Sequence, residues 1–183
     1  MLGLGTKLTK SKVVAPGIVT DGLVMKHMYP SGAVEPLSDG AAYFNSSNAH
    51  IDLGSQANTG DDITFGAWVN FTDTGVHPIV YFGDFLIQFS DDTTFRIYPD
   101  AGTGGASSAT IPSVLNNWTY ITAVVDDDIA HHYYNGVFKE TDTGLGTLST
   151  DTNAYSSLGK AATSYMGGYM CNAAIWSRVL TQS

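Results

Sequence analysis

The sequence predicts an all-β protein, and three features of its 183 residues support this. Apolar residues occupy every second position along residues 63–71, which is the period of a strand with one face turned to a core. Other short apolar runs follow at near-regular spacing, with turn residues between them. No helical segment is expected to separate these runs. The pattern is typical of a β-sandwich or a β-barrel.

The composition is that of a folded chain. Hydrophobic residues make up 43% and charged residues 14%, which suffices for one domain with a sizeable core. The chain lacks a run of about 18 apolar residues, so we expect no membrane span. Its first residues lack the apolar region of a signal peptide, so we expect no secretion signal. The net charge of −9 argues against a broad basic face for nucleic acid.

The charge is uneven and divides the chain into an N-terminal arm, residues 1–20, and a body, residues 21–183. Three lysines give the arm a charge of +3, which leaves −12 for the rest of the chain. Glycine and proline break any long helix in the arm. We expect the arm to attach the protein to other copies of itself or to neighbouring proteins. The arm residues predicted to make these contacts are Leu2, Leu4, Lys7, Leu8, Lys10 and Lys12.

The strands of the body can be placed in order along the sequence. Residues 41–44 and 49–53 are expected to form a short pair around the turn 45–48. After the strand at 63–71, the predicted strands are 79–82, 85–89, 94–98 and 117–125. The Gly-, Ala- and Ser-rich residues 99–108 are expected to form a mobile loop.

A hairpin is predicted around Asn135 and Gly136. This dipeptide favours the type I′ turn that joins two antiparallel strands, here 131–134 and 137–139. Residues 155–158 and 169–176 are the last predicted strands.

An ordered set of segments resembles the laminin-G/concanavalin A-like jelly-roll family. The segments are residues 42–54, 63–69, 118–125 with 134–137, and 158–180. The family's closing Asp-Glu pair is absent, because Asn172 and Ala173 occupy its place. The resemblance implies an antiparallel two-sheet sandwich, a concanavalin A-like jelly roll, with Trp68 and Trp176 in the core.

The arm together with residues 18–23 resembles the start of jelly-roll proteins from tailed phages of marine bacteria. That resemblance implies a virion structural protein, either a head decoration or a fibre component, made in the cytoplasm of a bacterial host. It also implies other virion proteins as partners. The single cysteine, Cys171, cannot form an intrachain disulfide, which agrees with such a compartment.

Catalysis is not expected. Some relatives on this fold hydrolyse glycans with carboxylates in a Glu-x-Asp-x-Glu pattern, and glycoside hydrolysis usually needs two carboxyl groups across the bond. The only glutamates are Glu35 and Glu140, which are far apart in sequence and outside that pattern. We therefore predict no catalytic residues and no enzyme activity.

Metal binding is also not expected. His131 and His132 are adjacent, so in a strand they point to opposite faces and cannot close on one ion. Acids at strand ends could supply Ca²⁺ with oxygen ligands, and the candidates are Asp91, Asp92, Asp126 and Asp128. The alternative is that acids in turns cap strands and aid solubility. We predict no bound cofactor.

Glycan binding is the alternative function, because aromatic side chains beside polar groups can hold a sugar. The candidates are Tyr98, Trp118, Tyr133 and Tyr155. The alternative for each is a place in the core, where aromatic residues of sandwich strands commonly lie.

Overall fold

In the computed structural model, two antiparallel sheets pack as a sandwich, and the described part of the chain contains no helix. The structure describes residues 23–27, 40–56, 60–83, 85–101, 105–148 and 155–181, with only the backbone of residues 23–27. The predicted two-sheet all-β architecture is therefore confirmed. The arm residues lie outside this description, and the boundary at residue 20 stays a prediction.

One layer is a seven-stranded sheet. Its order is β1 (Leu23–His27), β15 (Gly167–Trp176), β4 (Asp62–Phe71), β9 (Thr119–Asp126), β10 (Ile129–Tyr134) and β11 (Val137–Asp142), and β2 (Ala42–Asn45) also pairs with β15. The strand chosen from the sequence at residues 63–71 is β4, which lies in the middle of this sheet.

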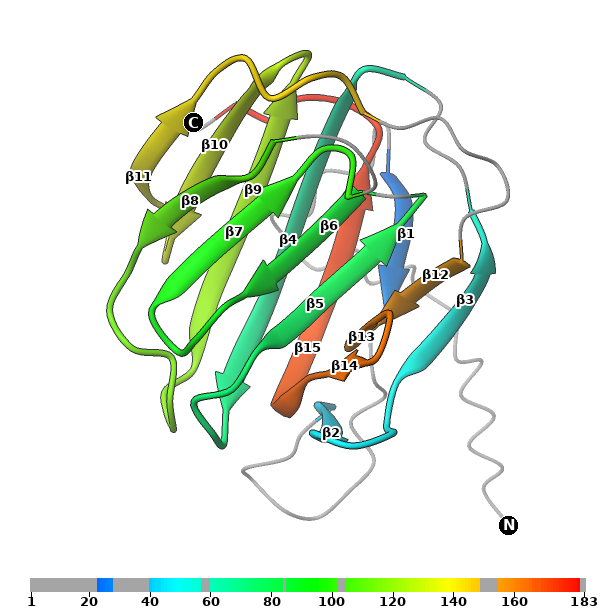
Figure 1. Ribbon diagram of the computed structural model, residues 1–183, viewed down its shortest axis with the longest axis vertical. Coiled ribbons are helices and arrows are strands. Elements are labelled where there is room, and N and C mark those ends of the chain that lie inside the picture. The colour runs from blue at the N-terminus through cyan, green and yellow to red at the C-terminus, as the bar shows by residue number, and fades with distance from the viewer. Residues whose placement is uncertain are drawn as a thin grey trace, which may run out of the picture.

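The second layer is a six-stranded sheet, which lies in front of the first in Figure 1. Its order is β3 (Ile51–Ser55), β12 (Tyr155–Leu158), β5 (His77–Phe82), β6 (Phe85–Phe89), β7 (Thr94–Tyr98) and β8 (Ser107–Thr110). A short ribbon of β13 (Lys160–Ala161) and β14 (Ser164–Tyr165) follows β12.

The core fills the space between the two sheets. The alternate residues of β4 that were predicted to face the core, Ile63, Phe65, Ala67, Val69 and Phe71, are at most 2% exposed. The six-stranded sheet contributes fully buried residues from β6 and β7, namely Ile87, Phe89, Phe95 and Ile97. Each such side chain stabilises the fold by roughly 1.5–3 kcal/mol relative to exposure.

The predicted hairpin is confirmed. Asn135 and Gly136 have φ angles of 48° and 76°, as both central residues of a type I′ turn require. They join β10 to β11, with Tyr134 opposite Val137.

The predicted pairing around residues 45–48 is wrong. β2 pairs with β15 in one sheet, whereas β3 pairs with β12 in the other. The Oδ1 atom of Asn45 accepts hydrogen bonds from the backbone N–H groups of Ser47, Asn48 and Ala49. This capped turn carries the chain from one layer to the other instead of folding it back as a hairpin.

The predicted loop 99–108 is too long at its C-terminal end. Ser107 and Ser108 belong to β8, which pairs with β7. The strand was missed because its inward positions are the small residues Ser107 and Ala109, which carry no β-branched or aromatic signal.

A candidate binding site on the outer aromatic face

Strand register places a row of aromatic side chains on the outer face of the seven-stranded sheet. Trp68 in β4 lies opposite Tyr120 in β9, and Tyr169 in β15 lies opposite Tyr43 in β2. Because Phe65 and its alternate neighbours point into the core, the other parity of β4 points outward.

The prediction that Trp68 is a core residue is therefore wrong, since it is 36% exposed and shares its face with Thr64, Gly66 and Asn70. Trp176 is buried as predicted, at 7% exposed. It is opposite Thr64, however, so it too lies on the outer face.

The rings on this face contact one another. Ring centroids are 5.3 Å apart for Trp68 and Tyr120, 5.1 Å for Tyr43 and Tyr169, and 6.4 Å for Trp118 and Tyr169. These spacings are those of favourable aromatic pairs. We call this surface the aromatic face and define it by Tyr43, Trp68, Trp118, Tyr120, Tyr133 and Tyr169.

Gly66 makes room for the central ring of the aromatic face. A Cβ atom on Gly66 would lie 2.4 Å from the Oη atom of Tyr120, so the tyrosine lies across the glycine. Burial raises the pKa of Tyr120, which keeps its hydroxyl protonated and able to donate a hydrogen bond.

Asn135 supplies an amide at the edge of the aromatic face. The side-chain Oδ1 atom of Asn135 accepts a hydrogen bond of 2.9 Å from the backbone N–H of Tyr120. The backbone N–H of Asn135 donates to the carbonyl of Tyr120 at 2.8 Å. These bonds fix the side chain, and its amide nitrogen can donate to a bound molecule.

Two hollows lie side by side on this face. The first has a volume of about 440 Å³ and is lined by Trp68, Trp118, Tyr120, Asn135 and Gly136. The second, of about 190 Å³, is lined by Tyr120 and Gly136 together with Thr64, Thr122, Val124, Tyr133, Trp176, Leu180 and Thr181. Tyr120 and Gly136 line both hollows and form the boundary between them.

Of the four predicted glycan-binding residues, Trp118 and Tyr133 lie on the aromatic face and line the hollows. Tyr98 lies on the outer face of the other sheet, where its hydroxyl is within hydrogen-bond distance of Gln88 and Arg96. Tyr155 in β12 lies beneath Lys160, whose Nζ atom is 4.9 Å from the ring centroid. All four side chains are half-buried, and their binding role stays a prediction.

Trp68, Tyr120 and Asn135 were not predicted. The alternation in β4 places Trp68 on the face that points away from the core. Tyr120 and Trp118 are two residues apart, so in a strand they share one face. Asn135 was recognised only as a turn residue.

The acidic candidates for Ca²⁺ lie at opposite ends of the sandwich. Asp126 is opposite Asp62 at the start of β4, whereas the carbonyl of Asp92 accepts a hydrogen bond from Val114, beside the end of β4 at Phe71. A ten-residue strand separates the two ends by about 30 Å. No group of three His, Cys, Asp or Glu residues in the described ranges is placed to hold a metal ion.

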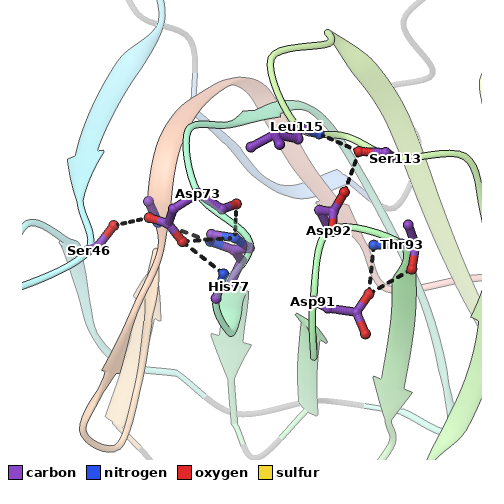
Figure 2. A network of polar contacts seen from close by, with 10 residues as sticks. Ser46, Asp73, His77, Asp91, Asp92, Thr93, Ser113 and Leu115 are labelled. Carbon is purple, nitrogen blue, oxygen red and sulfur yellow. Dashed lines mark hydrogen bonds and ion pairs between the residues drawn. The ribbon is translucent and has the colours of Figure 1, made fainter.

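Asp91 and Asp92 act as turn residues between β6 and β7 (Figure 2). The carboxylate of Asp91 accepts hydrogen bonds from the backbone and hydroxyl groups of Thr93 and Thr94. Burial raises the pKa of the Asp91 carboxyl group, whereas these hydrogen bonds lower it. The hydrogen bonds together have the larger effect, so the pKa is lowered. Asp92 accepts a hydrogen bond from Ser113.

His77 ties three segments together at the same end of the sandwich (Figure 2). Its Nδ1 atom accepts from the backbone N–H of Gly167, so the Nε2–H group donates to the carbonyl of Asp73. Burial lowers the pKa of His77. The hydroxyl of Ser46 donates to Asp73 and is the main reason that the pKa of this carboxyl group is lowered. Both histidine nitrogens are engaged within the fold.

The adjacent histidines face opposite sides, as predicted. His132 is fully buried, whereas His131 is half-buried and its Nδ1 atom lies 2.7 Å from the Thr141 hydroxyl. His132 contacts Ser107, which donates a hydrogen bond to Asp142. In a hydrolytic triad the acid orients the histidine. Here Asp142 binds the serine instead, and the serine is fully buried.

The two glutamates give no paired-carboxylate site within the described residues. Glu140 lies in β11 and is exposed, and Glu35 is outside the residues described. In the part of the chain that the structure covers, no helix is long and apolar enough to cross a membrane.

A family model described as the concanavalin A-like lectin/glucanases superfamily matches residues 45–183. No curated protein sequence matches the chain.

Solved structures share the fold at low sequence identity. Domain 4 of a GH43 extracellular arabinanase from Geobacillus stearothermophilus, in complex with arabinotriose, is 19% identical with a TM-score of 0.60, over 86% of this chain and 78% of that one. The CBM40 of a Ruminococcus gnavus IT-sialidase, bound to alpha2,3 sialyllactose, is 11% identical with a TM-score of 0.61. The match covers 78% of this chain and 94% of that one. A heptameric SAP-like pentraxin from Limulus polyphemus is 14% identical with a TM-score of 0.60. The match covers 78% of this chain and 77% of that one.

Proposed function

The chain belongs to the concanavalin A-like lectin/glucanases superfamily, and we propose that it is a non-catalytic glycan-binding module whose ligand lies on the aromatic face. The observation that carries this proposal is the hollow between Trp68, Trp118 and Tyr120, with the fixed amide of Asn135 at its edge.

The chemistry of this hollow suits a sugar. A pyranose ring has an apolar C–H face and a rim of hydroxyl groups. Aromatic rings provide rigid contact area for the apolar face at low entropic cost. The tyrosine O–H and tryptophan N–H groups can form hydrogen bonds with the hydroxyl groups of the rim. Trp68 and Tyr43 are 36% and 57% exposed, and a cluster of large exposed aromatic residues marks a binding surface.

The structural neighbours support the same class of ligand. Two of them, from different bacteria, are solved with oligosaccharides, namely arabinotriose and sialyllactose. At 19% and 11% identity these structures support the scaffold and do not identify the sugar.

The test is binding of the purified protein to a broad panel of polysaccharides, followed by titration with the best ligand. Trp68→Ala should weaken that binding at least about tenfold, or 1.4 kcal/mol, because it removes a wall of the hollow. Tyr165→Ala is the control, since it removes a half-buried aromatic ring in β14 that lines neither hollow. Absence of binding across the panel, or equal binding by both variants, would contradict the proposal.

We further propose that the module is carried on a phage particle and attached through its N-terminal arm. The charge of the chain supports attachment to an acidic surface such as a neighbouring body, because an arm of charge +3 precedes a body of charge −12. The resemblance of the arm to phage jelly-roll proteins supports a virion made in a bacterial cytoplasm.

Deletion of residues 1–17 tests the attachment. We expect a folded domain that melts within a few degrees of the parent but no longer assembles or attaches to its particle. Mass spectrometry of purified particles should detect the full chain. A truncated chain that unfolds would place the arm in the body's own sheet, and one that assembles normally would exclude the arm as the attachment device.

A further inference from the structure

The second hollow of the aromatic face differs in chemistry from the first. Its walls include Val124, Trp176 and Leu180, which meet on the far side of Tyr120 from Trp68. The hydroxyl of Thr64 is already engaged, since it donates to the carbonyl of Arg178 and accepts from the N–H of Leu180. The hollow is predominantly apolar, and its lining residues Tyr120, Thr122, Tyr133 and Thr181 each carry a hydroxyl group.

No charged side chain lines either hollow. The protein as a whole carries a charge of −9. An anionic sugar would lose hydration without gaining a cationic partner, and the field of the protein would repel it. The site therefore favours uncharged glycans over carboxylated or sulfated ones.

The volume of the second hollow limits what can enter it. About 190 Å³ corresponds to several water molecules of about 30 Å³ each. That space accommodates a small substituent of a sugar together with part of its ring. The group that fits these walls has a methyl for Val124 and Leu180 and an acceptor for the Thr122 or Tyr133 hydroxyl. An acetyl group has both.

We propose that the aromatic face recognises an uncharged, acetyl-bearing polysaccharide, with one sugar stacked at Trp68 and Trp118 and the acetyl group of its neighbour in the apolar hollow. The inference rests on the proposed glycan-binding function and specifies its ligand. The acetyl group can be an O-acetyl ester or an N-acetyl amide, because both present the same methyl and carbonyl groups.

Two matched ligand pairs test the proposal by isothermal titration of the full chain. The first pair is chitotetraose and cellotetraose, which share a β-1,4 backbone and differ in the N-acetyl group. The second pair is an acetylated xylan fragment before and after saponification, which differ in O-acetyl esters. Loss of an acetyl methyl from an apolar pocket should weaken binding about tenfold in at least one pair.

A variant pair assigns the effect to the hollow. Leu180→Gln keeps the size of a half-buried wall residue but makes it polar, so the preference for the acetylated ligand should fall severalfold. Val137→Gln is the control, because Val137 is 58% exposed and lines neither hollow.

The outcomes separate this inference from the function on which it rests. Equal binding of both members of each pair, or tighter binding of a carboxylated glycan, would overturn the acetyl proposal and leave glycan binding intact. Binding of no glycan at all would overturn both.

Discussion

The Nε2 atom of His132 lies 2.6 Å from the Oγ atom of Ser107, and both side chains are fully buried between the two sheets. Ser107 belongs to β8 of one sheet and His132 to β10 of the other. Because the serine hydroxyl donates to Asp142 at 2.7 Å, the histidine donates from Nε2. Its Nδ1 atom is then a buried lone pair, and it has no hydrogen-bond partner among the described residues. Protonation of Nδ1 would therefore bury a charged N–H group that has no partner among the described residues.

We predict that the protein loses stability as the pH falls from 6.5 towards 4. Burial is the main reason that the pKa of His132 is lowered to about 4; Asp142 opposes this effect and His131 adds to it. The unfolded chain, with an ordinary histidine pKa of about 6.5, binds the proton first in this window. Neutral His132 therefore makes its full contribution to the free energy of unfolding above pH 6.5. If the pKa difference is fully expressed, about 3 kcal/mol of that free energy is lost near pH 4. Urea melts across this range measure it.

His132→Asn should flatten that pH dependence. Part of the slope should remain, because burial also lowers the pKa of His77. His50→Asn is the control, since it makes the same replacement at an exposed histidine outside this network. A full slope in the His132 variant would show that other groups set the acid sensitivity.

We predict that Gly66→Ala reduces glycan affinity more than it reduces stability. The new methyl group would lie 2.4 Å from the Oη atom of Tyr120, which is the movable end of a side chain, so the ring should swing away from the boundary between the hollows. Affinity should fall about tenfold. In the double variant Gly66→Ala/Tyr120→Ala, the two losses should not add, because both act through the same ring. Additive losses would contradict this arrangement.

Sequence reasoning captured those elements whose signal is local. The alternation at Ile63–Phe71 predicted β4 because one buried face leaves a period of two. The Asn135–Gly136 turn was predictable because its backbone geometry selects the dipeptide. The pairing of β2 with β15 was not, since the two strands are more than a hundred residues apart in sequence and no local pattern records the choice.

Prediction of the site failed where assignment by resemblance replaced alternation. Trp68 was assigned to the core by the family pattern, although its parity in β4 faces outward, and the structure follows the parity. The boundary formed by Tyr120 and Gly136 depends on the register in which β9 pairs with β4 and with β10. That register decides which residues, distant in sequence, lie side by side on the sheet. A single sequence contains no direct signal for that register.

We predict that Gly168→Ala is strongly destabilising. A Cβ atom there would lie 2.1 Å from the carbonyl oxygen of Asn70 and 2.8 Å from the Cα atom of Phe71, both backbone atoms of the neighbouring strand. The φ angle of +130° adds strain for any residue with a side chain. The loss should be roughly 3 kcal/mol or more in a urea melt. Gly60→Ala is the control, because nothing lies within 4 Å of its Cβ position. Similar losses in both variants would refute the close approach.

The hydroxyl of Thr64 holds residues 178–180 beside the second hollow. This fully buried group donates to the carbonyl of Arg178 at 2.8 Å and accepts from the N–H of Leu180 at 3.0 Å. Thr64→Val keeps the shape and removes both bonds, so it should cost about 2 kcal/mol. Amide exchange at residue 180 should accelerate, because its N–H loses a buried acceptor.

Thr110→Val is the matched control for that change. Thr110 is exposed in β8, so the same chemical replacement should alter stability by no more than about 0.5 kcal/mol. Thr64→Val should also reduce the preference for acetylated ligands, because Leu180 forms part of the apolar wall, while stacking at Trp68 persists. A variant with unchanged exchange at residue 180 would mean that packing of Leu180, and not the Thr64 hydroxyl, fixes the C-terminal segment.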